Sequence, residues 1–349
     1  MKISQKAYAL NLLLLLTLCV SCSTIHDLAF KKRKDLVKTD ISEDFQLEKD
    51  KRILEKFKER KTSSVSKKSK TNKNSIRSKI SKVKRTIASV TPDSKKVTTD
   101  QYEHFWTLSR PIVDEGETFI FEVSYFGITA GHIKLTTESE KVVNGEARYH
   151  FNASMRSARF YSTFYSLDDS IDSYLDKKSF LPVKYVLTQR ESGQSVDDLQ
   201  IFDHEKNETH VFYKRLKKGK KKTYRKIASI PASFHDSYSA IHFVRSFPLR
   251  VGDKYEFPVI TRGKKWILKV NTLKHEIIKI MGEKIKAIKI KAETHYPGVL
   301  EKKGDIHFWF SADKHKKLLK FDAKVKIGTV TGDLVEYQKG KFSSSTSKE

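Results

Sequence analysis

A two-residue alternation of apolar and polar side chains recurs between residues 101 and 341, and it constrains the fold more than any other feature. Residues 118–126, 147–155 and 321–327 each place apolar side chains at every second position. Successive side chains of a β-strand point to opposite faces of a sheet, so the alternation predicts strands with one buried face. Asn144-Gly145, between two such runs, predicts a two-residue hairpin turn.

The order of these runs predicts a mainly β domain over residues 101–341. Further strands are expected near residues 183–190, 197–203, 207–215, 254–260, 266–270, 288–292 and 306–310. Because successive strands are joined by short connections, we expect a single antiparallel meander, curled into a barrel or half-barrel. One short helix, at about 236–247, is predicted from the N-cap Asp236 and from apolar residues at helical spacing before Pro248.

The N-terminus has the pattern of an export signal over residues 1–21. Lys2 and Lys6 precede an apolar run, Ala7–Leu18, that is too short to span a bilayer. Leu18-Cys19-Val20-Ser21-Cys22 resembles a bacterial lipobox, which predicts lipidation of Cys22. An ordinary secretory signal cut nearby is the alternative. The two cysteines both lie here, so no disulfide within the remaining chain is expected.

Residues 22–100 are predicted to form a basic, largely disordered tether. They contain 23 Lys/Arg against 11 Asp/Glu, within a chain of formal net charge +27. From Lys61 to Arg85 the segment lacks aromatic residues and has too little apolar surface to offset chain entropy. Ser42–Arg60 has enough apolar points for a marginal helix. A second disordered segment, the tail 342–349, is expected at the C-terminus.

Lysines crowd two parts of the predicted domain. The first set surrounds Gly219 at an expected hairpin tip and consists of Lys217, Lys218, Lys220, Lys221 and Lys222. The second set alternates with apolar positions on several predicted strands and consists of Lys265, Lys269, Lys289, Lys291, Lys324 and Lys326. Such lysines are candidates for binding an anionic envelope component, such as peptidoglycan, lipopolysaccharide or lipid head groups. Protection of sheet edges and solubility is the alternative interpretation. Nucleic acid is not expected as a partner, because the Lys61–Arg85 part of the tether lacks stacking aromatics and export removes the chain from the usual pool of nucleic acid.

Four stretches, in this order, resemble the bacterial domain-of-unknown-function 3108 (DUF-3108) family of exported proteins. They are Tyr125–Gly131; Phe164–Asp169 with Leu181-Pro182 and Tyr185; Asp236–Ala240 with Arg245 and Val251–Asp253; and Phe308–Asp313 with Leu318–Phe321 and Ile327-Gly328. The resemblance covers nearly all of residues 115–338 and implies a β-rich envelope domain. It implies no catalytic residues.

Catalytic and metal-binding motifs are not evident, so we expect no enzyme activity, no cofactor and no metal. Asp168, Asp169, Asp172 and Asp176 are the densest acidic group, but they lack the spacing of an EF-hand and are interpreted as strand-edge residues. Ser233, His235 and Asp236 contain the residue types of a catalytic triad, although helix capping by Asp236 explains more. His307 beside Trp309 is interpreted as a surface pair.

These observations favour a non-enzymatic outer-membrane lipoprotein that faces the periplasm. Its tether and β domain would bind an anionic envelope component, and a soluble periplasmic or secreted protein is the alternative. The second hypothesis is a carrier of lipid or another hydrophobic ligand on the concave face of the sheet. Its candidate lining residues, for which core packing is the other interpretation, are Phe119, Phe121, Tyr149, Phe151, Trp266 and Phe321. The sequence leaves the oligomeric state open.

Overall fold

The computed structural model describes residues 48–61, 106, 108–163, 165–295, 303–325 and 328–342. The lipidation candidate Cys22, the signal segment 1–21, Lys326 and residues 343–349 of the predicted tail lie outside these ranges. The same holds for residues 22–47 and 62–100 of the predicted tether.

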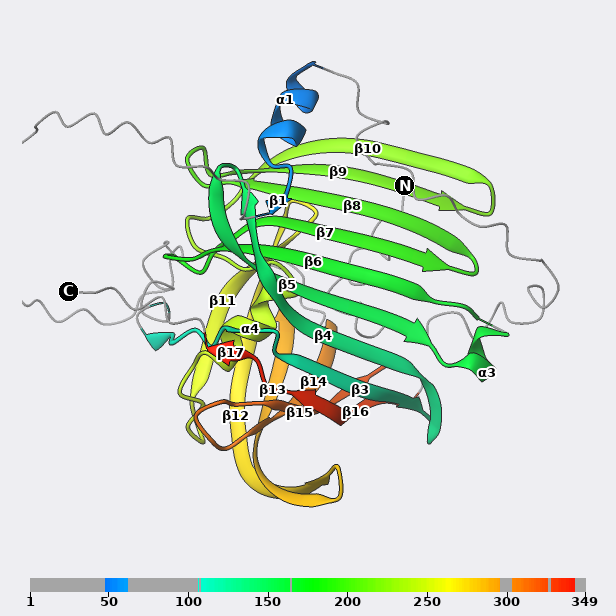
Figure 1. Ribbon diagram of the computed structural model, residues 1–349, viewed down its shortest axis with the longest axis vertical. Coiled ribbons are helices and arrows are strands. Elements are labelled where there is room, and N and C mark those ends of the chain that lie inside the picture. Colours follow the sequence, from blue (N-terminus) through cyan, green and yellow to red (C-terminus); the bar gives the residue numbers. More distant parts are fainter. Residues whose placement is uncertain are drawn as a thin grey trace, which may run out of the picture.

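One large antiparallel sheet forms the body of the molecule (Figure 1). Its strands form two meanders. The first consists of β3 Thr118–Tyr125, β4 Ile128–Val143, β5 Glu146–Ser157, β6 Asp168–Asp176, β7 Pro182–Glu191, β8 Gln194–Asp203, β9 Glu208–Lys217 and β10 Lys220–Ser229. The second consists of β11 Lys254–Thr261, β12 Lys264–Ile280, β13 Glu283–His295, β14 Lys303–Ser311, β15 Leu318–Lys324 and β16 Thr329–Gln338. The predicted strands are confirmed, and so is the antiparallel half-barrel.

The first strand of the first meander joins the last strand of the second meander. β16 pairs with β3, for example through Val330 opposite Tyr125, while β10 and β11 form the two edges of the sheet. The sheet therefore curls without closing. Two residues of β2, Asp114–Glu115, pair with β17, Lys341–Phe342, so the C-terminal pairing includes the first residue of the predicted tail.

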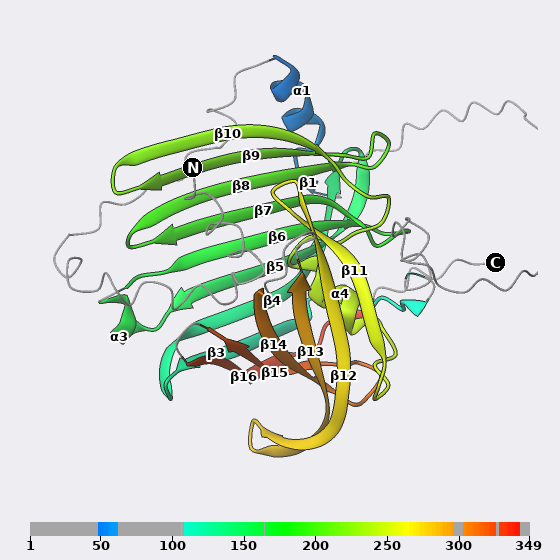
Figure 2. The ribbon, with the colours of Figure 1, turned by 180° about the vertical axis from the view of Figure 1, so that it is seen from behind.

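The predicted helix is confirmed as α4, Ser239–Arg245, and it lies in the concavity of the curled sheet (Figure 2). Asp236 caps it as expected, because its Oδ1 accepts from the backbone N–H groups of Tyr238 and Ser239, each at 2.8 Å. Four apolar side chains of this segment are nearly inaccessible: Tyr238, Ala240, Phe243 and Val244. They pack into the main core, which is built from the inner sides of both meanders.

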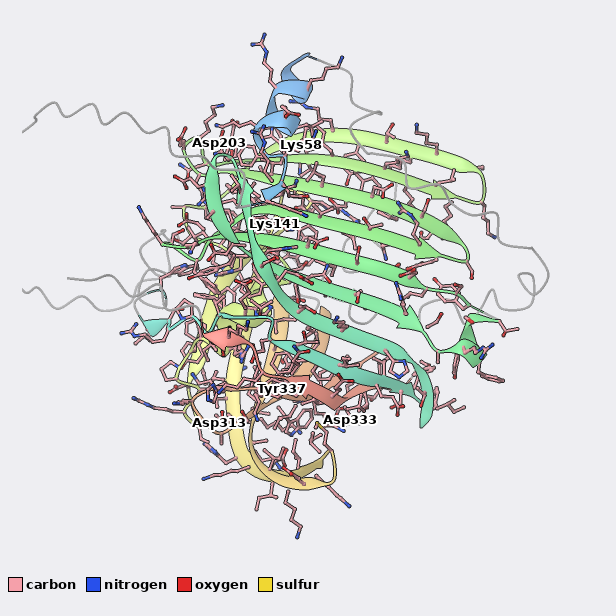
Figure 3. The ribbon with its side chains drawn as sticks, in the orientation of Figure 1. Lys58, Lys141, Asp203, Asp313, Asp333 and Tyr337 are labelled. Carbon is pink, nitrogen blue, oxygen red and sulfur yellow. The ribbon has the colours of Figure 1, made fainter. Side chains whose placement is uncertain are left out.

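A second, smaller core lies on the outer side of the first meander, where α1, Glu48–Lys56, packs. Phe57 is 4% exposed and contacts a cluster that includes Tyr174, Leu199 and Phe212. After α1, the two-residue strand β1, Arg60–Lys61, pairs with β4. Figure 3 shows Lys58, which lies between α1 and β1 in the chain, and Lys141 on β4.

The helix α1 lies within Ser42–Arg60, where the sequence predicts a marginal helix, and residues 48–61 pack against the first meander. Ile53, Leu54 and Phe57 contribute the apolar surface that the rest of the predicted tether lacks. A third helix, α3 Arg159–Ser162, joins β5 to β6 and was not expected from the sequence.

Among the described residues, five two-residue turns have the form X-Gly, with both residues at positive φ. They are Phe126-Gly127, Asn144-Gly145, Lys218-Gly219, Arg262-Gly263 and Met281-Gly282. Two left-handed residues give the turn the twist of the flanking strands, and glycine adopts this conformation without strain. The predicted hairpin at Asn144-Gly145 is confirmed. The other four turns place a larger side chain where asparagine is usual.

Candidate functional site

The hairpin of β9 and β10 carries the first set of predicted lysines at its tip. Lys217 pairs with Lys220 across the turn Lys218-Gly219, whose φ angles are 47° and 76°. All five lysines are exposed, and β10 forms a free edge of the sheet. Within the described residues, no carboxylate forms an ion pair with Lys217, Lys218, Lys220 or Lys222.

Cations oppose each other on one face of this hairpin. Arg215 lies directly opposite Lys222, and Lys217 lies directly opposite Lys220. Side chains two residues apart on a strand share a face, so the four cations form a rectangle of about 5 by 7 Å at the backbone. Like charges placed directly opposite each other destabilise a strand pair, and a bound anion would remove that penalty.

An aromatic pair lies beside the four cations on the same face. The rings of Tyr213 and Tyr224 stack with their centroids 4.8 Å apart, and Lys222 Nζ lies 5.9 Å from the Tyr224 centroid. Arg215 and Tyr224 were not predicted as site residues from the sequence. Their places follow from the register of β9 against β10, which the hairpin signal Lys218-Gly219 could have supplied.

Two of the five described members of the second set of predicted lysines pair with carboxylates. Lys269 pairs with Glu256 at 2.9 Å, and Lys291 pairs with Glu293 at 2.5 Å and Asp305 at 3.2 Å. Lys289 Nζ lies 4.5 Å from the ring centroid of Trp309. The remaining described members, Lys265 and Lys324, are exposed on different parts of the sheet. Carboxylates therefore pair with part of this set, whereas none pairs with Lys217, Lys218, Lys220 or Lys222 among the described residues.

His235 and Asp236 occupy the base of α4, away from solvent. His235 is 0% exposed and stacks on Phe243, with ring centroids 4.1 Å apart. Its Nδ1 lies 3.0 Å from the Ser239 hydroxyl, and burial lowers the pKa of the imidazole well below its ordinary value. Asp236 is occupied by helix capping and accepts the Ser173 hydroxyl. This enclosed pair holds the helix start rather than presenting a nucleophile, and Ser233 is not among its partners.

The acidic group of β6 is divided between the two faces of the sheet. On the outer face Asp168 pairs with Arg156, Asp172 with His150, and Asp176 with Arg148. Asp169 points to the inner face, where it is 1% exposed. No cluster of three or more potential His, Cys, Asp or Glu metal ligands occurs among the described residues.

Asp169 belongs to a buried polar cluster with Glu191. The Gln189 side-chain amide donates to Asp169 Oδ2 at 3.2 Å and to Glu191 Oε1 at 3.1 Å, and Tyr165 donates its hydroxyl to Glu191 at 2.6 Å. Burial, followed by the charge of Glu191, raises the pKa of Asp169 to about 7. The cluster can therefore take up a proton near neutral pH.

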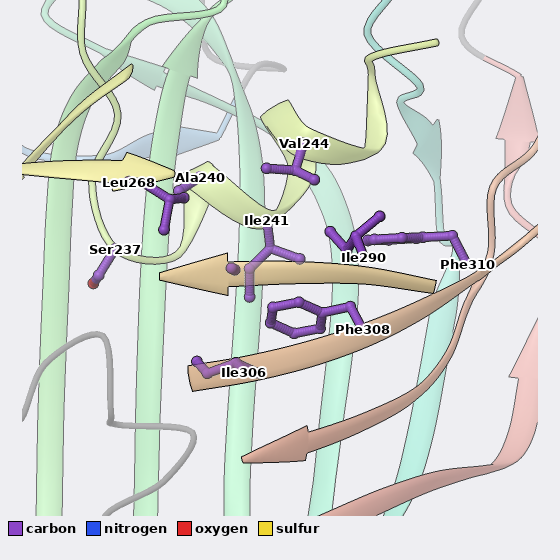
Figure 4. A pocket seen from close by; sticks show the side chains of 10 residues that line it. Ser237, Ala240, Ile241, Val244, Leu268, Ile290, Ile306, Phe308 and Phe310 are labelled. Carbon is purple, nitrogen blue, oxygen red and sulfur yellow. The ribbon is translucent and has the colours of Figure 1, made fainter. Parts of the chain in front are cut away.

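An apolar pocket lies between α4 and β12–β14 (Figure 4). Its lining includes Ile241, Leu268, Ile290 and Phe308, and about 30 Å³ of its volume admits a water-sized molecule. That volume is close to one water molecule and far below the few hundred cubic ångströms of a typical ligand site.

The residues proposed to line a carrier cavity pack as core instead. Phe121 contacts Phe321 with ring centroids 5.7 Å apart, and Phe119 and Phe151 are 5% and 0% exposed. Trp266 is also buried, and Tyr149 packs against the main core. His307 is partly buried with its ring 6.2 Å from that of Trp309, which is 5% exposed, so these two do not form a surface pair.

No helix among the described residues is long and apolar enough to cross a membrane. The fold defines a mainly β protein with an open, curled antiparallel sheet around one helix. The chain belongs to the family described as protein of unknown function (DUF3108), whose model matches residues 120–335. The resemblance noted in the sequence is thereby confirmed.

Comparison with curated proteins gives no match to this chain. Among solved structures, a β-barrel-like protein of domain of unknown function DUF1849 from Brucella abortus is similar, with TM-score 0.44 and 11% identity over 65% of this chain and 99% of the other. A candidate lipoprotein from Parabacteroides distasonis has TM-score 0.30 and 11% identity over 65% and 96% of the two chains. A candidate exported protein with a YmcC-like fold from Bacteroides fragilis has TM-score 0.30 and 9% identity over 66% and 100%.

Proposed function

We propose that this protein is an exported, lipid-anchored envelope protein without enzyme activity, whose β domain binds an anionic envelope component at the β9–β10 hairpin. One observation carries the proposal: the four cations at the tip of the β9–β10 hairpin lie on one face, beside the stacked rings of Tyr213 and Tyr224. Lysines on the edge strand β10 would also protect that edge from pairing with another chain, but edge protection does not require the cations Arg215 and Lys217 on the inner strand β9.

Lipid anchoring at Cys22, in the outer membrane facing the periplasm, is the part of this proposal that rests on the sequence. The apolar run Ala7–Leu18 and the lipobox-like residues before Cys22 support it. Mass spectrometry of the mature N-terminus tests it. A diacylated Cys22 is expected, and an unmodified N-terminus at another residue would refute the anchor.

The binding proposal is tested by lysine footprinting of the full chain reconstituted in zwitterionic vesicles. An amine-acetylating reagent is applied alone, with lipopolysaccharide, with peptidoglycan fragments, or in vesicles that contain phosphatidylglycerol. We expect at least one of the three anionic components to slow acetylation of Lys217–Lys222 about tenfold at low salt, with recovery at high salt, because the attraction is screened.

Exposed lysines that lie opposite uncharged residues elsewhere on the sheet provide the internal control: Lys254, opposite Asn271, and Lys265, opposite Ile260. Their acetylation rates should change less than about twofold under the same conditions, because isolated cations attract a polyanion weakly. Equal protection of both sets, or no protection of the hairpin by any anionic component, would refute the proposal.

A further inference from the structure

Five connections lie in a row at one end of the strands that run from β15 through β16 and β3 to β10. Because neighbouring strands are antiparallel, the β15–β16 connection, the β3–β4 turn, α3, the β7–β8 turn and the β9–β10 turn all lie at this end. Figure 1 shows the last four along one side of the molecule, from the β3–β4 turn below to the β9–β10 turn above. We call this row of connections the docking edge.

The middle of the docking edge exposes large apolar side chains. Phe126 and Ile128, at the β3–β4 turn, are 66% and 54% exposed, and Phe160 on α3 is 70% exposed. The two elements are neighbours, because the Ala158 N–H, just before α3, donates to the β4 carbonyl of Ala130 at 2.8 Å. Exposed apolar side chains gathered in this way are typical of interaction sites.

Phe126 occupies a turn position that a bulky residue rarely adopts. Its φ is 50°, in the left-handed region, and Gly127 follows at 74°. Asparagine is the usual residue there, as in the Asn144-Gly145 turn of the same sheet. The Phe126 ring contacts Tyr125, with ring centroids 4.4 Å apart, yet most of the side chain faces solvent. A strained aromatic residue that buries little surface points to a role outside the fold.

Cations flank the exposed apolar residues on both sides. The hairpin lysines lie at one end of the docking edge, about 20 Å from α3 at the usual spacing of strands. Lys324 is exposed at the other end, next to the β15–β16 connection, and Arg159 is exposed on α3 beside Phe160. The edge thus combines aromatic side chains with basic groups over a length suited to a flat partner.

We propose that the docking edge rests on an anionic phospholipid bilayer, with Phe126 and Phe160 inserted at the level of the head groups. This inference depends on the proposed function, because it names the anionic partner of the hairpin lysines. A polar polymer would leave the exposed aromatic side chains in water. A bilayer interface favours aromatic side chains and attracts lysines at the same time.

Tryptophan quenching in the full, reconstituted chain tests the orientation. Phe126→Trp and Phe160→Trp each introduce a tryptophan on the docking edge, and Ile277→Trp introduces one at a 70% exposed site on β12, away from it. The signal of the parent chain, which has three tryptophans, is subtracted. Vesicles contain brominated lipids, either zwitterionic alone or mixed with phosphatidylglycerol.

In phosphatidylglycerol vesicles at low salt we expect at least twofold quenching at positions 126 and 160, and less than about 20% at position 277. High salt or purely zwitterionic vesicles should abolish most of the quenching. Protection of the hairpin lysines by phosphatidylglycerol without quenching at 126 and 160 would overturn this inference while leaving the proposed function intact. Protection by peptidoglycan alone would overturn it in the same way, whereas loss of both signals would overturn both proposals.

Discussion

The guanidinium of Arg262 donates from Nε to the carboxylate of Asp198 at 2.5 Å, and this ion pair connects the two meanders of the open sheet. Arg262 lies in the β11–β12 turn and Asp198 on the inner face of β8, and their side chains are 6% and 0% exposed. The Arg262 backbone N–H also donates to the Gln200 side chain at 2.7 Å. These contacts hold the edge at β11 against the first meander without a backbone ladder between them.

Removing one partner of this pair should destabilise the protein strongly. Arg262→Met leaves Asp198 buried without its counter-charge, and burial already raises the pKa of that carboxyl above its ordinary value. We expect a loss of about 3–5 kcal/mol in the free energy of unfolding, measured by urea denaturation. The double variant Arg262→Met with Asp198→Leu should recover most of the loss, since an apolar pair carries no uncompensated charge. Equal losses in both variants would show that packing, not charge, matters here.

The strands and the central helix were predictable because local patterns specify them. The alternation in residues 118–126, the turn Asn144-Gly145 and the cap Asp236 each depend on neighbours in sequence, and all three have their expected structure. The β16–β3 pairing was not predictable, because it joins residues about 200 positions apart whose alternation fits several partners.

The candidate site was only partly predictable for a related reason. Lysine density around Gly219 is visible in the sequence, but the opposition of Arg215 and Lys222 depends on strand register. Glu256 and Asp305, which pair with Lys269 and Lys291, lie on neighbouring strands, so a single run of sequence could not show these two ion pairs.

Proton binding by Asp169 should make the protein less stable as pH rises. The folded-state pKa of about 7 lies above the ordinary value of 3.8, so the folded protein holds a proton that the unfolded chain releases. Stability is therefore expected to fall between about pH 4 and pH 7, by about 2–4 kcal/mol, and then to level off. Urea denaturation across this range measures the slope. Asp169→Asn should flatten it, whereas the 52% exposed neighbour in Asp168→Asn should not.

The docking of α1 should depend on Phe57. This side chain is 4% exposed, and replacing it with alanine removes much of the contact between α1 and the outer core. A helix of nine residues is marginal without tertiary contacts, so Phe57→Ala should release it locally. We expect amide hydrogen exchange in residues 48–61 to accelerate more than about tenfold, with smaller changes in β3–β5. Lys51→Ala, at an exposed position of the same helix, is the control, and similar exchange in both variants would contradict this prediction.

Phe126 should lower the stability of the fold, because a bulky side chain occupies a left-handed turn position there and buries little surface. Phe126→Asn places a residue that tolerates the left-handed conformation at φ 50°, and we expect it to raise the free energy of unfolding by about 0.5–1 kcal/mol. Loss of the ring contact with Tyr125 offsets part of the gain. The reciprocal variant Asn144→Phe, at the equivalent turn position with φ 53°, should destabilise by about 1 kcal/mol.

Urea denaturation of both turn variants separates strain from packing. A gain for Phe126→Asn together with a loss for Asn144→Phe shows that the aromatic ring is not there for stability. If Phe126→Asn instead lowers the free energy of unfolding by more than about 1 kcal/mol, the ring is needed for the local packing around Tyr125 and Gly328. Gly328 lies close to the ring, because a Cβ atom at this position would be 3.0 Å from Phe126. In that case backbone strain at Phe126 would not support membrane docking, and only the exposed apolar side chains and the flanking cations would support it.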